Sequence, residues 1–182
     1  MKKYLLLIAF VMSCTVHAQT FYNIKKNKNC DLSHKCKLKF AYNNDNKSYT
    51  YKTIDIGLAE VSRHSDKSLE ASLVKVVDKD KNVVIAAVFT GKVKDCTDKN
   101  SYASLLLKDG NRVKLMSLSF TKDCHSNYMI VNLTDEDFAL LTTSGITKVR
   151  LHYVNNEEDF DIDPIGQIAF LESLKCIETV VN

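Results

Sequence analysis

Apolar and polar residues alternate with a period of two along much of this chain. In the first such segment, Leu38, Phe40 and Tyr42 alternate with Lys37 and Lys39. Successive side chains of a strand point to opposite faces, so this pattern is typical of a strand with one buried face. Further alternating or β-branched segments are 49–58, 73–77, 83–89, 105–107, 113–115, 148–153 and 160–162. The chain is therefore predicted to be mainly β, as an antiparallel β-sandwich or sheet.

The segment around Gly110 predicts a hairpin. A three-residue loop, with Gly110 or the residue after it in the left-handed region, pairs Leu107 with Val113 and Leu105 with Leu115. A two-residue loop would place both leucines opposite charged residues. The longer loop is preferred because it keeps one consistent buried face.

A second hairpin is predicted between the segments 148–153 and 160–162. The predicted pairs are Tyr153 with Phe160, Leu151 with Ile162, His152 with Asp161, and Arg150 with Asp163. This register gathers apolar side chains on one face and opposite charges on the other.

Two helices are predicted. Thr134 is a candidate N-cap before the acidic residues 135–137, and Gly145 follows as a stop signal, which indicates a short connecting helix. Asp163 and Pro164 fit the N-cap and first position of a C-terminal helix. The stripe expected to pack on a sheet is Ile165, Ile168, Leu171, Leu174 and Ile177.

Residues 1–18 have the pattern of a secretory signal peptide. Two lysines precede a short apolar run, and Val16 and Ala18 supply the small residues that a signal peptidase needs. We expect residues 19–182 to form a single β-rich domain in the periplasm or outside the cell. A competing hypothesis is lipid anchoring at Cys14, because the preceding residues loosely resemble a lipobox.

Charge and hydropathy narrow the expected partners. The apolar run of residues 5–12 is shorter than the roughly 20 residues that cross a bilayer, and no later segment is longer, so no transmembrane segment is predicted. Without residues 1–18, which contain two lysines, 23 basic residues stand against 22 acidic ones. This near-neutral balance argues against a nucleic-acid partner.

Five cysteines follow the leader, and in an oxidising compartment disulfides are their expected state. The register of the hairpin around residue 110, extended outward, places Cys96 opposite Cys124, and this pair is the first predicted disulfide. Cys30 with Cys36 is the preferred second pair, which would leave Cys176 as a buried thiol. The alternative is that Cys30 or Cys36 pairs with Cys176.

Residues 19–52 form the main candidate binding region, because eight lysines stand there against two aspartates and aromatic residues lie among them. The candidate residues are Lys25, Lys26, Lys37, Lys39, Tyr49 and Tyr51. Basic and aromatic side chains suit anionic polymers, sugars or lipid headgroups. Alternatively, the tyrosines pack inward and the lysines protect a sheet edge from aggregation.

Other candidate sites are weaker. The acidic residues 157–163 contain oxygen ligands for calcium, but they alternate on a predicted strand opposite Arg150 and His152. Cys124 and His125 are adjacent, so their side chains point to opposite faces of a strand and do not form a thiol–imidazole pair. No catalytic motif, cofactor or metal site is predicted.

The order of elements over 101–177 resembles small exported bacterial β-rich proteins of unknown function. The shared features are a strand, an Asp-Gly hairpin, a second strand, the acidic helix start at 134–138, the strands 145–151 and 159–162, and a terminal helix. The resemblance implies a fold and an exported location, and no catalytic residue. The leading hypothesis is therefore an exported, non-catalytic binding protein. The alternatives are an envelope hydrolase using His125 or His152, and an inhibitor or immunity-type binder.

Overall fold

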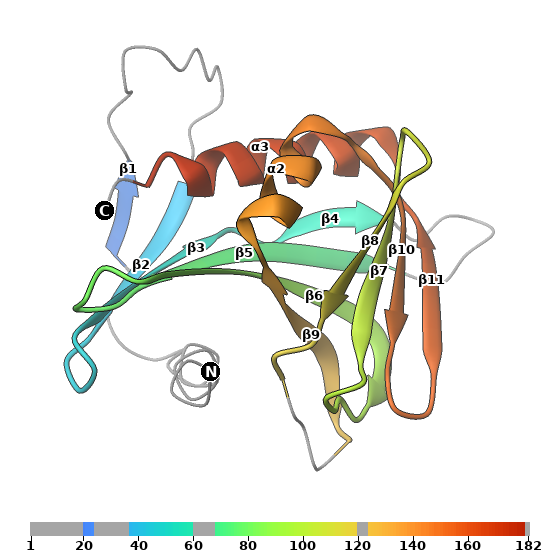
Figure 1. Cartoon of the computed structure of the whole chain (residues 1–182), viewed down its shortest axis with the longest axis horizontal. Helices are drawn as coiled ribbons and strands as arrows, with labels where there is room; N and C mark the ends of the chain where they lie inside the picture. The colour runs from blue at the N-terminus through green and yellow to red at the C-terminus, as the bar shows by residue number, and fades with distance from the viewer. Residues whose placement is uncertain (1–19, 24–36, 60–67, 120–123, 181–182) are drawn as a thin grey trace.

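A computed structural model of the chain describes residues 20–23, 37–59, 68–119 and 124–180, and the following statements concern these residues. They form two antiparallel sheets and two helices (Figure 1). The prediction of a mainly β fold, with a short connecting helix and a C-terminal helix, is confirmed.

The first sheet contains seven strands. Its order is β1 (Thr20–Asn23), β2 (Lys37–Asn43), β3 (Ser48–Thr53), β5 (Leu69–Val77), β6 (Val83–Asp95) and β9 (Ser126–Leu133), and β4 (Ile56–Ala59) pairs with β5 beyond β3. The central strand β5 is buried on nearly every residue, which agrees with its run of apolar and β-branched residues. The pairing of β6 with β9 shifts register after Thr90, where the chain bends toward the second sheet.

The second sheet contains four strands. Its order is β11 (Glu157–Asp161), β10 (Ile146–His152), β7 (Tyr102–Leu107) and β8 (Arg112–Met116). Buried residues alternate with exposed ones along β8 and β11 and with half-buried ones along β7, as the sequence pattern predicts. Figure 1 shows this sheet at one end of the first sheet, on the side where the helices lie.

The hairpin of β7 and β8 has the predicted buried face but a different register. Leu105 pairs with Val113, so the predicted partner of Leu107 was wrong by two residues. The Leu107 amide donates to the Asn111 carbonyl at 2.9 Å, and Gly110 takes the left-handed conformation with φ of 87°. A three-residue turn ending in glycine is therefore confirmed. The turn begins one residue earlier than expected, so every residue of β7 pairs with a residue two positions earlier in β8 than predicted.

The register predicted for β10 and β11 was wrong by four residues. Val149 pairs with Phe160, and His152 pairs with Glu157 instead of Asp161. The turn is tighter than expected because the Tyr153 amide donates to the Asn156 carbonyl at 2.9 Å. A shift by an even number keeps the side chains on their predicted faces.

Both helices begin as predicted. In α2 (Asp135–Thr143), the Thr134 hydroxyl accepts from the Asp137 amide, and the Asp137 carboxylate accepts from the Thr134 amide. In α3 (Pro164–Glu178), the Asp163 carboxylate accepts from the Gly166 amide at 2.7 Å. The N-terminal signals of both helices are local, which is why the sequence identifies them.

The predicted apolar stripe of α3 is correct only in its second half. Leu174 and Ile177 are buried, whereas Ile165 is 79% exposed and Ile168 60% exposed. The buried residue of the first turn is Gly166, whose Cα lies so close to the Leu58 backbone that a Cβ would overlap it. This close crossing of β4 turns the two isoleucines outward.

The main core joins the first sheet, both helices and the second sheet. Phe89 of β6, Leu105 of β7, Leu151 of β10 and Phe170 of α3 are among its buried side chains. A smaller buried cluster lies on the other face of the first sheet and consists of Val74, Val76, Ala86, Val88 and Ile130. The helices and the second sheet therefore pack on one face of the first sheet.

Candidate functional site

Four aromatic side chains form a continuous strip on the β2–β3 hairpin. The register pairs Phe40 with Tyr51 and Tyr42 with Tyr49. Ring centroids are 5.3 Å apart for Phe40 and Tyr51, 5.8 Å for Phe40 and Tyr49, and 4.8 Å for Tyr42 and Tyr49. We call these four residues the aromatic strip. It crosses two neighbouring strands and is built from cross-strand pairs.

The aromatic strip runs from the core into solvent. Tyr51 packs against the main core, and burial, with a smaller contribution from Tyr49, raises the pKa of its hydroxyl. At the other end, Tyr42 is 44% exposed and Tyr49 43% exposed. Even spacing puts these side chains on the face of the first sheet that α3 covers farther along. The predicted inward packing of tyrosines is therefore correct for Tyr51 and wrong for Tyr49.

Two polar turns lie beside the exposed end of the aromatic strip. Residues 44–47 connect β2 to β3, and residues 78–82 connect β5 to β6. Tyr49 pairs with Val77, which places the second turn next to the first, and Figure 1 shows both at the same end of the sheet. Asparagine side chains shape the first turn, where Asn43 accepts from the Asp45 amide and Asn46 accepts from the Ser48 hydroxyl.

Of the predicted lysines, Lys39 is the one whose side chain is described, and it does not join the aromatic strip. Lys39 pairs with Lys52, and both positions alternate with the strip residues, so they lie on the opposite face of the sheet. Lys52 forms an ion pair with Asp55 at 3.0 Å. Lys25 and Lys26, and the side chain of Lys37, lie outside the described residues. Within the described part, the structure brings Tyr49 and Tyr51 together and separates them from Lys39.

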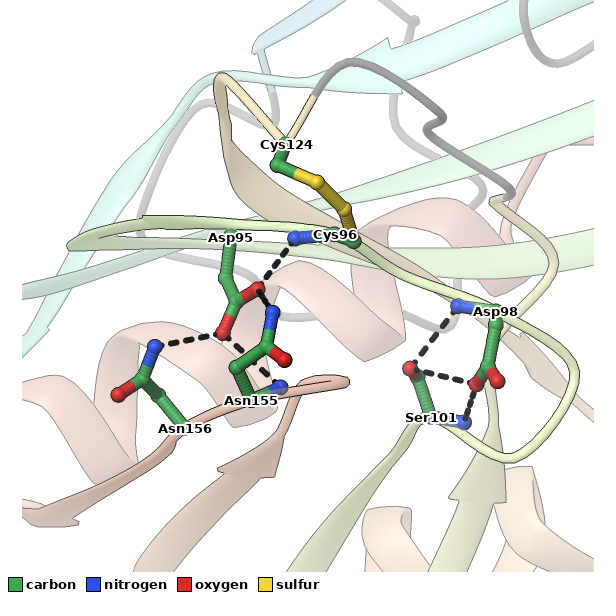
Figure 2. Close-up of a disulfide and its surroundings, with 7 residues drawn as sticks. All are labelled: Asp95, Cys96, Asp98, Ser101, Cys124, Asn155 and Asn156. Carbon is green, nitrogen blue, oxygen red and sulfur yellow. Dashed lines mark hydrogen bonds between the residues drawn. A yellow bond between two sulfur atoms is a disulfide. The ribbon is translucent and has the colours of Figure 1, made fainter.

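The predicted disulfide between Cys96 and Cys124 is present (Figure 2). The sequence pattern predicted this pair as an outward extension of the β7–β8 hairpin, but the bond lies elsewhere. Cys96 follows the end of β6 and Cys124 precedes β9, and these strands pair with each other through Asp95 and Ser126. The bond therefore ties two neighbouring strands of the first sheet.

A buried carboxylate next to this disulfide connects the two sheets. Asp95 accepts hydrogen bonds from the Cys96 amide at 2.6 Å, the Asn155 amide at 3.2 Å, the Asn155 side chain at 2.9 Å and the Asn156 side chain at 2.7 Å (Figure 2). Burial alone would raise the pKa of Asp95, but these hydrogen bonds outweigh it and hold the pKa below its usual value. No sequence signal identifies this arrangement, because Asp95 lies about 60 residues from both asparagines.

Cys176 is disulfide-bonded, so the expectation of a free buried thiol at this position was wrong. The partner of Cys176 lies outside the described residues. Cys30 and Cys36 themselves lie outside the described residues, as does Cys14, so the pairing of Cys30 with Cys36 stays a prediction.

The outer face of the second sheet holds paired charges. Arg150 binds Asp159, Lys148 binds Asp161 at 2.9 Å, and His152 Nδ1 contacts Glu157 at 2.6 Å. These contacts engage Glu157, Asp159 and Asp161 of the acidic run that suggested calcium. Within the described residues, no group of three or more histidine, cysteine, aspartate or glutamate side chains is placed to hold a metal ion.

The histidines named for the hydrolase hypothesis lie in different settings. His152 stacks on Tyr102 with ring centroids 3.9 Å apart, and the Lys114 Nζ atom lies over the Tyr102 ring, 3.8 Å from its centroid. His125 is exposed just before β9. These contacts of His152 are those of a cross-strand row of side chains on a sheet surface.

One acidic residue is buried against expectation. Glu158 pairs with Leu151 and lies on the inner face of β11, close to Gly91. Tyr153 is also buried, and burial together with Glu158 and Asp95 raises the pKa of its hydroxyl. Glu158 is two residues before the buried Phe160 and so points the same way, and the tighter turn makes Glu158 part of β11.

Comparison with known proteins gives no relative: no family model, curated protein or solved structure matches this chain. None of the helices in the described residues is long and apolar enough to cross a membrane.

Proposed function

We propose that this chain is an exported, non-catalytic binding protein that attaches to a component of the cell envelope or extracellular space. Its leader-like residues 1–18 and its cysteine content support export. The disulfide between Cys96 and Cys124 also supports it, because such bonds persist in oxidising compartments.

The exposed end of the aromatic strip is the observation that carries the binding proposal. Tyr42 and Tyr49 each combine an apolar ring with a polar hydroxyl and are more than 40% exposed. Aromatic residues of this kind are enriched at interfaces, where they provide a large contact area at low entropic cost. Phe40 stacks on Tyr49, and Tyr49 packs against Tyr42, so each exposed ring has an aromatic neighbour in the strip.

The binding proposal is tested by cosedimentation with native cell envelope. The full chain is expressed with its own leader and purified from the exported fraction, as wild type, as the double variant Tyr42→Ser/Tyr49→Ser and as the control Tyr102→Ser. Tyr102 is a tyrosine on the second sheet, away from the aromatic strip. We expect the wild type and the control to bind and the double variant to bind at least about tenfold more weakly.

Two results would contradict the binding proposal: no binding by the wild type, or equal binding by the double variant. Thermal unfolding of each protein shows that it is folded, and both substituted side chains are exposed enough for the double variant to keep its fold.

The export proposal has its own test. Cell fractionation, followed by N-terminal sequencing, should find the chain outside the cytoplasm and beginning at Gln19. A chain that stays in the cytoplasm with residues 1–18 attached would contradict this proposal.

A further inference from the structure

We infer that the aromatic strip binds an uncharged carbohydrate chain. This inference rests on the proposed binding function and specifies its ligand. Three features of the described surface lead to it: the chemistry of the exposed rings, the balance of charge around them, and the narrow shape of the strip.

The ring chemistry fits a sugar. Tyr42 and Tyr49 offer apolar ring surface and hydroxyl groups at the same place, and the adjoining turn contributes the amide-bearing residues Asn44 and Asn46. A sugar ring likewise presents C–H groups on its faces and hydroxyls at its edge. Tyrosine and asparagine together provide stacking surface and adaptable hydrogen bonds.

The charge around the aromatic strip favours an uncharged ligand. The charged residues of its two flanking turns are Asp45, Asp78 and Asp80 against Lys47, Lys79 and Lys81. Equal numbers of opposite charges give no net field to attract an anionic polymer. Lys39 and Lys52 could attract an anionic polymer, but they lie on the opposite face of the sheet. An anionic glycan or nucleic acid is therefore a poorer match than a neutral chain.

The shape of the aromatic strip favours a narrow polymer over a folded protein. The strip is two strands wide and consists of four side chains. A stable protein–protein interface takes about 20 to 30 residues from each side. A carbohydrate chain lying along the hairpin needs only the rings and the polar groups beside them.

The test is affinity electrophoresis of the exported full chain in gels containing a neutral polysaccharide (dextran, mannan or xyloglucan) or an anionic one (alginate or heparin). We expect retardation by a neutral polysaccharide that does not change with salt. The double variant Tyr42→Ser/Tyr49→Ser should bind at least about tenfold more weakly, and Tyr102→Ser should bind like the wild type. The variant Tyr49→Phe, which keeps the ring, should retain most of the binding.

A second arm uses the native envelope and separates this inference from the proposed function. Periodate destroys sugar rings that carry neighbouring hydroxyls, and protease removes proteins. Loss of strip-dependent binding after periodate but not after protease supports the inference. Loss after protease alone would overturn it and leave the binding function standing with a protein partner. Retardation only by alginate or heparin, falling with salt, would also overturn it.

Discussion

At the scale of single residues, a few polar and small side chains fix how distant segments meet. Asp95 gathers four donors from two different segments in a buried position. Gly166 allows α3 to cross β4 at backbone contact. Each residue type has a physical reason: a carboxylate accepts several hydrogen bonds at once, and glycine has no Cβ.

Asp95→Asn is expected to destabilise the protein by about 2 kcal/mol at neutral pH, because an amide nitrogen would then face donors. The native pKa of Asp95 lies below its unfolded value, so its contribution is present above the unfolded pKa of about 3.9 and is lost as pH falls through the native pKa. Denaturant unfolding of the wild type and of Asp95→Asn should show a difference in the free energy of unfolding that becomes smaller in acid. The matched control Asp80→Asn, in an exposed turn, should change little, and a pH-independent loss in Asp95→Asn would contradict the explanation.

Gly166→Ala should lower the free energy of unfolding by about 2 to 3 kcal/mol, because the new methyl group would overlap the Leu58 backbone. The backbone cannot move aside as a flexible side chain could. Gly57→Ala is the control, because nothing lies within 4 Å of the position that its Cβ would take. Equal thermal stability of the two variants would show that α3 and β4 do not cross this closely.

At the scale of elements, local signals place strands and helix starts, whereas contacts with the rest of the protein choose the buried face. The N-caps of α2 and α3 and the glycine turn of β7 and β8 follow from short sequence patterns. The exposure of Ile165 and Ile168 does not follow from such a pattern, because the apolar residues in the first turns of α3 are compatible with more than one buried face. The same limit applies to the aromatic strip. Alternation predicts that Tyr49 and Tyr51 share a face, but it does not predict that Tyr51 packs on the core while Tyr49 is exposed.

The two halves of α3 should respond differently to substitution. Ile168→Ser should change the free energy of unfolding by no more than about 0.5 kcal/mol, because this side chain is already exposed. Leu174→Ala should cost about 2 to 5 kcal/mol, because it leaves a cavity in the main core. Chemical denaturation measures both, and a large loss for Ile168→Ser would mean that the predicted stripe, rather than the observed one, faces the sheet.

At the scale of the whole molecule, the disulfide and the Asp95 hydrogen bonds act at one junction. The Cys96–Cys124 bond closes the ends of β6 and β9, and the Val154 amide donates to the Cys96 carbonyl at 3.1 Å. The turn between β10 and β11 is thereby attached to the end of the first sheet. This junction lies away from the β2–β3 hairpin, so the strip can be altered without disturbing it (Figure 1).

Removing this disulfide by Cys96→Ser/Cys124→Ser should lower the free energy of unfolding by about 3 to 4 kcal/mol, given the sequence separation of 28 between the two cysteines. The loss reflects the greater freedom of the unfolded chain. Denaturant unfolding without reductant measures it. The binding assay on the same variant should be unchanged under conditions where it is folded, and lost binding would show that the aromatic strip depends on the junction.

Residue type and spacing over a few positions are enough to predict the β class, the segments that form most strands and the two helix starts. The Cys96–Cys124 pair was also predicted, but from a hairpin register that the structure does not have. Sequence patterns did not predict the register of the two hairpins, the pairing of β6 with β9, the outward face of α3 or the separation of Lys39 from the aromatic strip. These features depend on which distant segments pack together, and a shift by two or four residues leaves the local alternation unchanged.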